Sequence, residues 1–229
     1  MFDFDIALSM RKVSIALVPM LLGMVCHEVA HGWAAYRQGD PTAKNLGRLT
    51  LNPLPHIDPT GTLVFILTAL TSPFVIGWAK PVPVNPRYFR DPRKGMMLVS
   101  LAGPLTNFLL AILFGLGYRL VAESIVSGGA ISSVPSVHNG TQEFLLSMCG
   151  MGVWINLTLC WFNLMPIPPL DGSKIAAGLM SPQMARTYLQ VERYGLVIVM
   201  LLLASGLLGK VVWPLVDGSA RLISALIGI

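Results

Sequence analysis

Long apolar runs separated by short polar segments dominate this chain. Four of them cover residues 13–36, 95–118, 144–164 and 194–213. Each run is close to the ~20 consecutive apolar residues that a helix needs to cross a bilayer. The pattern therefore predicts four transmembrane helices.

A fifth apolar run, residues 61–79, is interrupted by the Ser72-Pro73 pair. Proline in a helix interior removes a backbone hydrogen bond and kinks or ends the helix. This run could cross the membrane or re-enter on the side from which it came, and both alternatives stay open.

The composition agrees with a membrane location. Hydrophobic residues make up 54% of the chain and charged residues 12%, and the mean hydropathy of +0.66 is too high for a water-soluble domain. The net charge of +5 comes from Lys and Arg residues that lie between the apolar runs and form no dense tract. Such residues fit basic loops beside a lipid bilayer better than a nucleic-acid surface.

We therefore expect an all-α polytopic membrane protein with four to five transmembrane helices. A re-entrant or extended segment should follow the first of them, and residues 1–229 should form a single membrane domain. A cleaved signal peptide is the alternative for the first run. We reject that alternative because cleavage would remove or sever the ionisable residues within the run.

Those ionisable residues form the stretch HEVAH, residues 27–31. On a helix His27 and His31 lie on one face one turn apart, and so both imidazoles can bind one zinc ion. Glu28 lies beside the metal rather than on it, where it could take a proton from zinc-bound water. Two helix-face histidines could instead be satisfied by hydrogen bonds. Ionisable groups at membrane depth are costly, however, and this favours the metal.

A catalytic zinc site usually has three protein ligands and an open position for water. Asp171 is the favoured third ligand, because it ends a segment, NLMPIPPLDG (163–172), in which three prolines break the helix. Irregular backbone at membrane depth is tolerated only inside protein or beside a water-filled cavity. Asp171 could instead be an ordinary turn residue. His56 is a second candidate ligand, whereas His138 lies in a polar loop and is expected to be solvated.

Three motifs in this order resemble the site-2 protease family of intramembrane zinc metalloproteases. They are HEVAH (27–31), AGPLTN (102–107) and NLMPIPPLDG (163–172), and the resemblance extends over about residues 13–203. It implies that His27, His31 and Asp171 bind one Zn²⁺ per chain and that Glu28 is the general base. It also implies that Asn163 helps to hold the substrate or to stabilise the reacting carbonyl.

The resemblance implies further that the stretch GWAKPVPVNP (77–86) is a short extended loop that can pair with an unwound substrate. The expected substrate is a transmembrane protein or peptide, cleaved within or near its single membrane span. PDZ and CBS domains, which many relatives carry, are not recognisable in this sequence. We assign Asn107 to helix packing rather than to catalysis, because amides in membrane helices commonly join neighbouring helices.

The distribution of basic residues bears on orientation. If residues 61–79 re-enter, eleven of the sixteen Lys and Arg residues gather on one side of the membrane. These residues are Arg37, Lys44, Arg48, Lys80, Arg87, Arg90, Arg93, Lys94, Lys174, Arg186 and Arg193. The positive-inside rule places that side in the cytoplasm. We therefore expect a protein of the cell membrane with its active site toward the cytoplasmic side, although Arg11 and Lys12 would then lie outside.

A non-proteolytic zinc-binding membrane scaffold or transporter is the alternative function. Many transporters contain paired repeats with broken helices at corresponding positions. No such repeat is visible in this chain, and this favours the protease.

Overall fold

The computed structural model describes residues 6–71, 77–129 and 140–228, and no strand occurs within these ranges. Its α-helices are α1 (Ile6–Arg37), α2 (Thr42–Asn45), α3 (Pro59–Thr71), α4 (Pro92–Gly129), α5 (Gly140–Asn163), α6 (Asp171–Leu179), α7 (Pro182–Leu189), α8 (Gly195–Ala204) and α9 (Leu207–Ile227). Short 3₁₀ turns cover Leu54–His56, Pro86–Tyr88 and Gln190–Tyr194. The predicted all-α fold is confirmed for the described part of the chain.

Four helical segments are long and apolar enough to cross a membrane. They are Val13–Arg37, Pro92–Val126, Gly140–Asn163 and Pro182–Ala204. The predicted number of spans is therefore confirmed, and the first three coincide with the predicted apolar runs.

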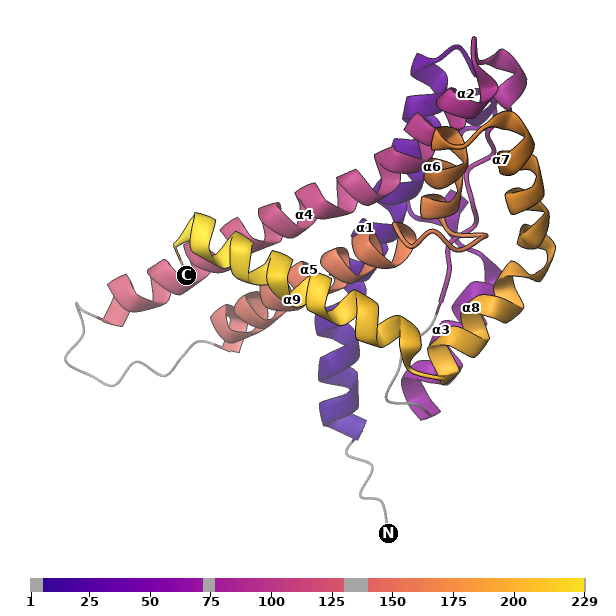
Figure 1. The fold of residues 1–229 in the computed structure, drawn as a ribbon. Helices are drawn as coiled ribbons and strands as arrows, with labels where there is room; N and C mark the ends of the chain where they lie inside the picture. The colour runs from indigo at the N-terminus through magenta and orange to yellow at the C-terminus, as the bar shows by residue number, and fades with distance from the viewer. Residues whose placement is uncertain (1–5, 72–76, 130–139, 229) are drawn as a thin grey trace.

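The fourth span differs from the prediction in its boundaries. The run 194–213 is not one helix, because α8 ends at Ala204 and Gly206 adopts a left-handed backbone with φ of +72°. Glycine adopts this conformation without the strain that a side chain would add, and it commonly ends helices. The chain turns here, and α9 begins at Leu207 in a new direction (Figure 1).

Helix α3 has 13 residues, which correspond to about 20 Å at 1.5 Å per residue. This helix alone is shorter than the ~30 Å hydrocarbon core of a bilayer, as a re-entrant segment would be. Ser72 and Pro73, which interrupt the run in the sequence, lie outside the described residues.

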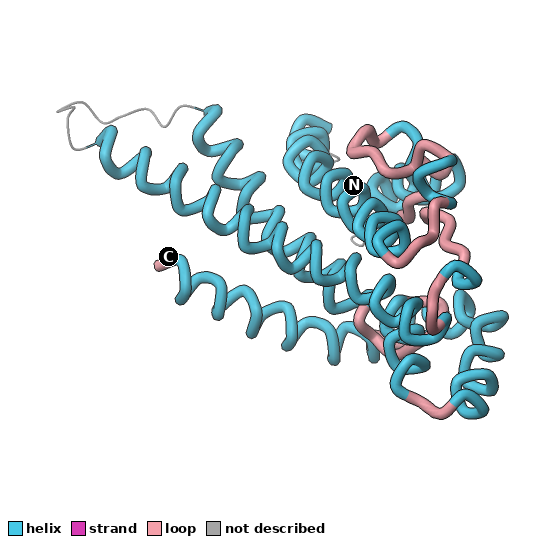
Figure 2. Tube along the Cα trace, turned by 90° about the horizontal axis from the view of Figure 1, so that it is seen from above, coloured by secondary structure: helices cyan, strands magenta, loops and turns pink. Residues whose placement is uncertain are grey.

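Helices α1, α4 and α5 pack against one another at the centre of the molecule (Figures 1 and 2). Helix α6 packs against α4, while α9 lies along α5 and contacts α4. The buried side chains of α9 recur four or seven residues apart, as one face of a helix requires. They are Leu208, Val212, Val216, Ile223 and Ile227. The crossing of α1, α4 and α5 positions the site described below.

Candidate metal centre

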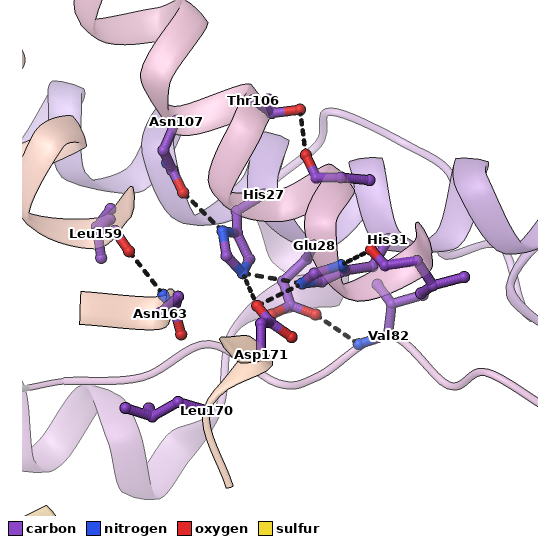
Figure 3. Close-up of polar contacts among 12 residues, drawn as sticks. His27, Glu28, His31, Val82, Thr106, Asn107, Leu159, Asn163, Leu170 and Asp171 are labelled. Atoms are coloured by element: carbon purple, nitrogen blue, oxygen red, sulfur yellow. Dashed lines mark hydrogen bonds and ion pairs between the residues drawn. The ribbon is translucent and has the colours of Figure 1, made fainter. Parts of the chain in front are cut away.

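His27 and His31 lie one turn apart on the same face of α1, as their spacing predicts (Figure 3). Both are buried, with 8% and 9% of their surface exposed. Their Nε2 atoms approach to 2.9 Å. The two imidazoles therefore direct one nitrogen each toward a common point inside the protein.

Asp171, the first residue of α6, completes this group. Its Oδ2 atom lies 3.1 Å from the Nε2 atom of His27 and 3.1 Å from that of His31 (Figure 3). The chain reaches this position because Gly172 packs directly against the backbone carbonyl of Leu164, where no side chain would fit. Thus the Asp-Gly pair is more than a turn, since the glycine allows the close approach that brings in the carboxylate.

The chemistry of these three atoms fits a bound cation. The Nδ1 atom of His31 lies 2.7 Å from the backbone oxygen of Val99, and a carbonyl can only accept, so Nδ1 carries the proton. The Nε2 atom of a neutral His31 is then a bare acceptor that faces a carboxylate oxygen at 3.1 Å. Two acceptors at this distance repel each other unless a cation or a proton lies between them. The group of His27, His31 and Asp171 could hold a metal ion, and nitrogen and carboxylate ligands suit zinc.

Helix α4 lies directly against both imidazole rings at Gly103. A Cβ atom built on this glycine would lie 2.5 Å from Cε1 of His31 and 2.7 Å from Cε1 of His27. A real Cβ atom would force the rings or the helix to move. Gly103, within the AGPLTN motif, therefore sets the distance between α4 and the histidines.

Glu28 is next to the ligand group but not part of it. Its Oε2 atom accepts a hydrogen bond of 2.7 Å from the backbone N–H of Val82, which lies in the segment 77–86 (Figure 3). The other carboxylate oxygen accepts no hydrogen bond that we identify among the described residues. Glu28 thus has one oxygen anchored and one available beside the candidate metal.

Hydrogen bonds to several separate groups attach the segment 77–86 to the rest of the protein. Lys80 donates its N–H to the backbone oxygen of His56 and accepts from the guanidinium of Arg48. Asn85 donates its N–H to Asp40. Burial raises the pKa of Asp40, but hydrogen bonds from Thr42 and from the Asn85 N–H outweigh it and hold the pKa below its usual range.

The structure does not bring the remaining candidate residues into the ligand group. Asn163, at the end of α5, donates its amide to Leu159 within its own helix, and no hydrogen bond among the described residues joins it to the histidines (Figure 3). His56 is buried, with its Nε2 atom 2.9 Å from the backbone oxygen of Thr50. His138 lies outside the described residues.

Asn107 has a larger part in the site than sequence reasoning assigned to it. It contacts α1 and α5, as a residue of helix packing should. Its Oδ1 atom also lies 2.6 Å from the Nδ1 atom of His27 (Figure 3). One signal in the sequence could have indicated this contact, because Asn107 lies four residues after Gly103 and so on the same face of α4.

Fold and site together define an integral membrane protein with a buried His-His-Asp group that could hold a metal ion. The chain belongs to peptidase family M50, the site-2 protease family, whose model it matches over residues 15–205.

Curated relatives point to the same class of protein. The candidate zinc metalloprotease YwhC of Bacillus subtilis (strain 168) is 36% identical over 216 residues, which cover 92% of this chain and 91% of the relative. The candidate zinc metalloprotease Rip2 of Mycolicibacterium smegmatis is 26% identical, covering 86% of this chain and 69% of the relative. Rip2 of Mycobacterium tuberculosis (strain H37Rv) is 28% identical, covering 80% of this chain and 63% of the relative. No solved structure gives a significant match.

Proposed function

We propose that this protein is an intramembrane zinc metalloprotease that hydrolyses peptide bonds within or near the membrane segments of single-span proteins. Its substrate would be a transmembrane protein or peptide. Membership of family M50 and the names of the relatives support a metallopeptidase. The location of the His-His-Asp group among membrane-spanning helices supports a substrate that is itself in the membrane.

His27, His31 and Asp171 would hold the zinc ion, and the protein would leave a further position for water. When bound, zinc would polarise the scissile carbonyl and lower the pKa of that water to about 7. Glu28 would take a proton from the water at its free carboxylate oxygen and deliver it to the leaving amine. The Val82 N–H, on the other oxygen, would hold the carboxylate in place while the proton moves.

Asn163 would help to hold the substrate or to stabilise the reacting carbonyl. Its support is its position in the NLMPIPPLDG motif, eight residues before Asp171. Its side-chain oxygen accepts no hydrogen bond that we identify among the described residues, which would leave that oxygen able to accept an N–H of the substrate.

A substrate helix has its carbonyls tied in backbone hydrogen bonds and must unwind locally before it is attacked. The segment 77–86 could receive the unwound part as an added strand. This segment is close to the site, because its Val82 N–H is bonded to Glu28. The basic residues around it support a location of the site toward the cytoplasmic side of the cell membrane.

One observation carries the proposal: Glu28 lies beside three ligand atoms that converge on one point, and one of its carboxylate oxygens accepts no hydrogen bond that we identify among the described residues. A metal-binding scaffold would need the ligands but not this carboxylate. Glu28→Gln therefore separates the two functions, because glutamine has nearly the same shape but cannot accept the proton.

The test co-expresses a single-span membrane substrate with either the wild type or Glu28→Gln and follows the cleaved fragment. We expect cleavage to fall by about 10²- to 10⁴-fold, while zinc in the purified variant stays at the wild-type level. Glu143→Gln is the matched control, since this exposed residue lies at the opposite end of α5 from Asn163 and forms an ion pair with Arg11. Equal cleavage by wild type and Glu28→Gln would contradict the proposal.

A further inference from the structure

Two buried asparagines connect three helices beside His27. Neither Asn107 on α4 nor Asn156 on α5 has any exposed surface. The Nδ2 atom of Asn107 lies 3.1 Å from the backbone oxygen of Gly23 on α1 and 3.1 Å from Oδ1 of Asn156. The Nδ2 atom of Asn156 in turn lies 2.9 Å from the backbone oxygen of Gly152. The Oδ1 atom of Asn107 completes the chain, at 2.6 Å from Nδ1 of His27.

The backbone carbonyls of Gly23 and Gly152 determine which atom donates in each of these hydrogen bonds. A backbone carbonyl can only accept, and so Gly23 must receive an N–H from Asn107 and Gly152 one from Asn156. Turning either amide around would place its oxygen against a carbonyl oxygen. Asn107 therefore presents its oxygen to His27.

The orientation of the Asn107 amide determines which nitrogen of His27 carries the proton. Because Asn107 offers only an acceptor, the Nδ1 atom of His27 must carry a proton and donate it. In the neutral ring the Nε2 atom is then bare, and this is the atom that faces His31 and Asp171. A neutral imidazole has two tautomers, and only this one leaves Nε2 free to bind a metal.

We infer that Asn156 is a positioning residue for the metal centre and that it acts on His27 through Asn107. This inference rests on the proposed metal site. Among the described residues, no hydrogen bond joins Asn156 directly to a proposed ligand or to a proposed catalytic residue. It accepts one N–H of Asn107, which holds that amide in the orientation that selects the metal-binding tautomer of His27.

The packing around the two asparagines is consistent with a fixed orientation of their amides. A Cβ atom on Gly23 would lie 2.8 Å from Oδ1 of Asn156, so the closeness of α1 and α5 depends on a residue without a side chain. Amides buried in hydrocarbon are costly unless they are hydrogen-bonded. Here both N–H groups of Asn107 are used, which leaves the amide no alternative partner to turn toward.

The test measures the zinc dissociation constant of the purified full-length protein. Loss of an outer hydrogen-bond partner of a metal-binding histidine typically costs about 10- to 100-fold in metal affinity. We expect a loss of this size for Asn107→Leu and a smaller one, several-fold, for Asn156→Leu. The double variant should bind zinc as Asn107→Leu does, because Asn156 has no route to His27 once Asn107 is removed.

The matched control is Thr158→Val. Thr158 lies on the same helix as Asn156, but among the described residues its hydroxyl donates to the backbone oxygen of Trp154 in that helix and to no other group that we identify. The zinc dissociation constant of this variant should equal that of the wild type. An unchanged constant in Asn156→Leu, or fully additive losses in the double variant, would overturn the inference.

Two further measurements test the role of Asn156 and the tautomer of His27 if the leucine variants do not fold. The buried side chain in Asn156→Asp is expected to be protonated, so that its O–H donates to the Gly152 carbonyl and its other oxygen accepts from Asn107. Its zinc affinity should then stay within a few-fold of the wild type. The ¹⁵N shifts of the His27 ring in the metal-free wild type should show a proton on Nδ1. A tenfold or larger loss in Asn156→Asp, or a bare Nδ1 atom with the proton on Nε2, would overturn the inference. None of these readouts uses cleavage, so failure of the proposed protease function would be seen separately.

Discussion

The two sides of the candidate metal centre are held in different ways. His27 and His31 lie in α1 and Asp171 lies in α6, two helices that both pack against α4, and each of these side chains is buried. On the opposite side of Glu28, the segment 77–86 has no helix or strand before Pro86, and most of its residues are exposed or half-buried.

The hydrogen bonds on these two sides of the centre also differ. Each histidine is hydrogen-bonded to α4 through its Nδ1 atom, inside a packed helix interface. His31 is bonded to the backbone oxygen of Val99, and His27 to the side chain of Asn107. The segment 77–86 is joined to its surroundings by hydrogen bonds to separate groups. The Val82 N–H donates to Glu28, the Asn85 N–H donates to Asp40, and the Arg48 guanidinium donates to the backbone oxygens of Lys80 and Pro81. The ligand side, which holds His27, His31 and Asp171, is therefore the more constrained of the two. The segment side, residues 77–86, is less constrained, as the proposed pairing with a substrate strand would require.

The largest effect should come from the ligand side. Asp171→Ala removes one of three protein ligands, and we expect the purified variant to lose nearly all bound zinc and all cleavage while it remains inserted and folded. Zinc per chain is measured by elemental analysis beside a far-UV circular dichroism spectrum. His56→Ala is the control and should keep its zinc. Full zinc in Asp171→Ala would exclude this residue as a ligand and return His56 to consideration.

Packing against the histidines should matter next. Gly103→Ala places a Cβ atom 2.5 Å from His31 and 2.7 Å from His27, so the rings must shift from their ligand positions. We expect the zinc dissociation constant to rise by about 10- to 100-fold. Gly150→Ala is the matched control, since its nearest contact would be an ordinary 3.6 Å to Tyr118. Wild-type zinc affinity in Gly103→Ala would show that the ligand side is more adaptable than we argue.

A change on the segment side should affect cleavage and spare the metal. Val82→Pro deletes the N–H that anchors Glu28, and both neighbours, Pro81 and Pro83, already favour extended backbone. A hydrogen bond to a charged group contributes about 1.5 to 3 kcal/mol, and so cleavage should fall by about 10- to 100-fold at unchanged zinc content. Val82→Ala keeps the N–H and should cleave almost as well as the wild type. Similar rates for the alanine and proline variants would show that this N–H does not matter.

The smallest effect concerns Asp40, which accepts a hydrogen bond from Asn85 near the end of the segment 77–86. Because hydrogen bonds hold its pKa below the usual value of 3.8 in the folded protein, the ionised form stabilises the fold above that pH. This stabilisation is lost as the pH falls through the lower, folded pKa. Between pH 5 and pH 2, the melting temperature of the wild type should therefore fall further than that of Asp40→Asn. Parallel curves for the two proteins would show that Asp40 does not anchor the segment in this way.

Local patterns in the sequence were sufficient for much of this molecule. The spacing of His27 and His31 determines that they share a helix face, and the prolines before Asp171 indicate the broken backbone that carries this residue to them. The family resemblance directed attention to the same residues. The apolar runs gave the number of membrane spans, because hydropathy over ~20 residues is itself the physical requirement for spanning.

Other features depend on contacts between distant segments. The hydrogen bond from Val82 to Glu28 comes from a backbone N–H, which every residue except proline carries, and so no residue type indicates it. Asn107 was recognised as a residue that joins helices, but its bond to His27 depends on how α1 and α4 cross. The break at Gly206 could have been expected from the Ser-Gly pair, but hydropathy averaged over a long run conceals a single turn.

The prolines of the segment 77–86 have a consequence for self-association. In extended backbone, neighbouring residues direct their N–H and C=O groups to opposite sides. The N–H groups of Lys80 and Val82 are bonded within the protein. Pro81 and Pro83 have no N–H, and so the edge that carries them lacks donors at these two positions. A second copy of this segment could not form a complete ladder with that edge, because each would lack the donors that the other requires. The edge is thereby protected from strand-to-strand aggregation in the crowded plane of a membrane.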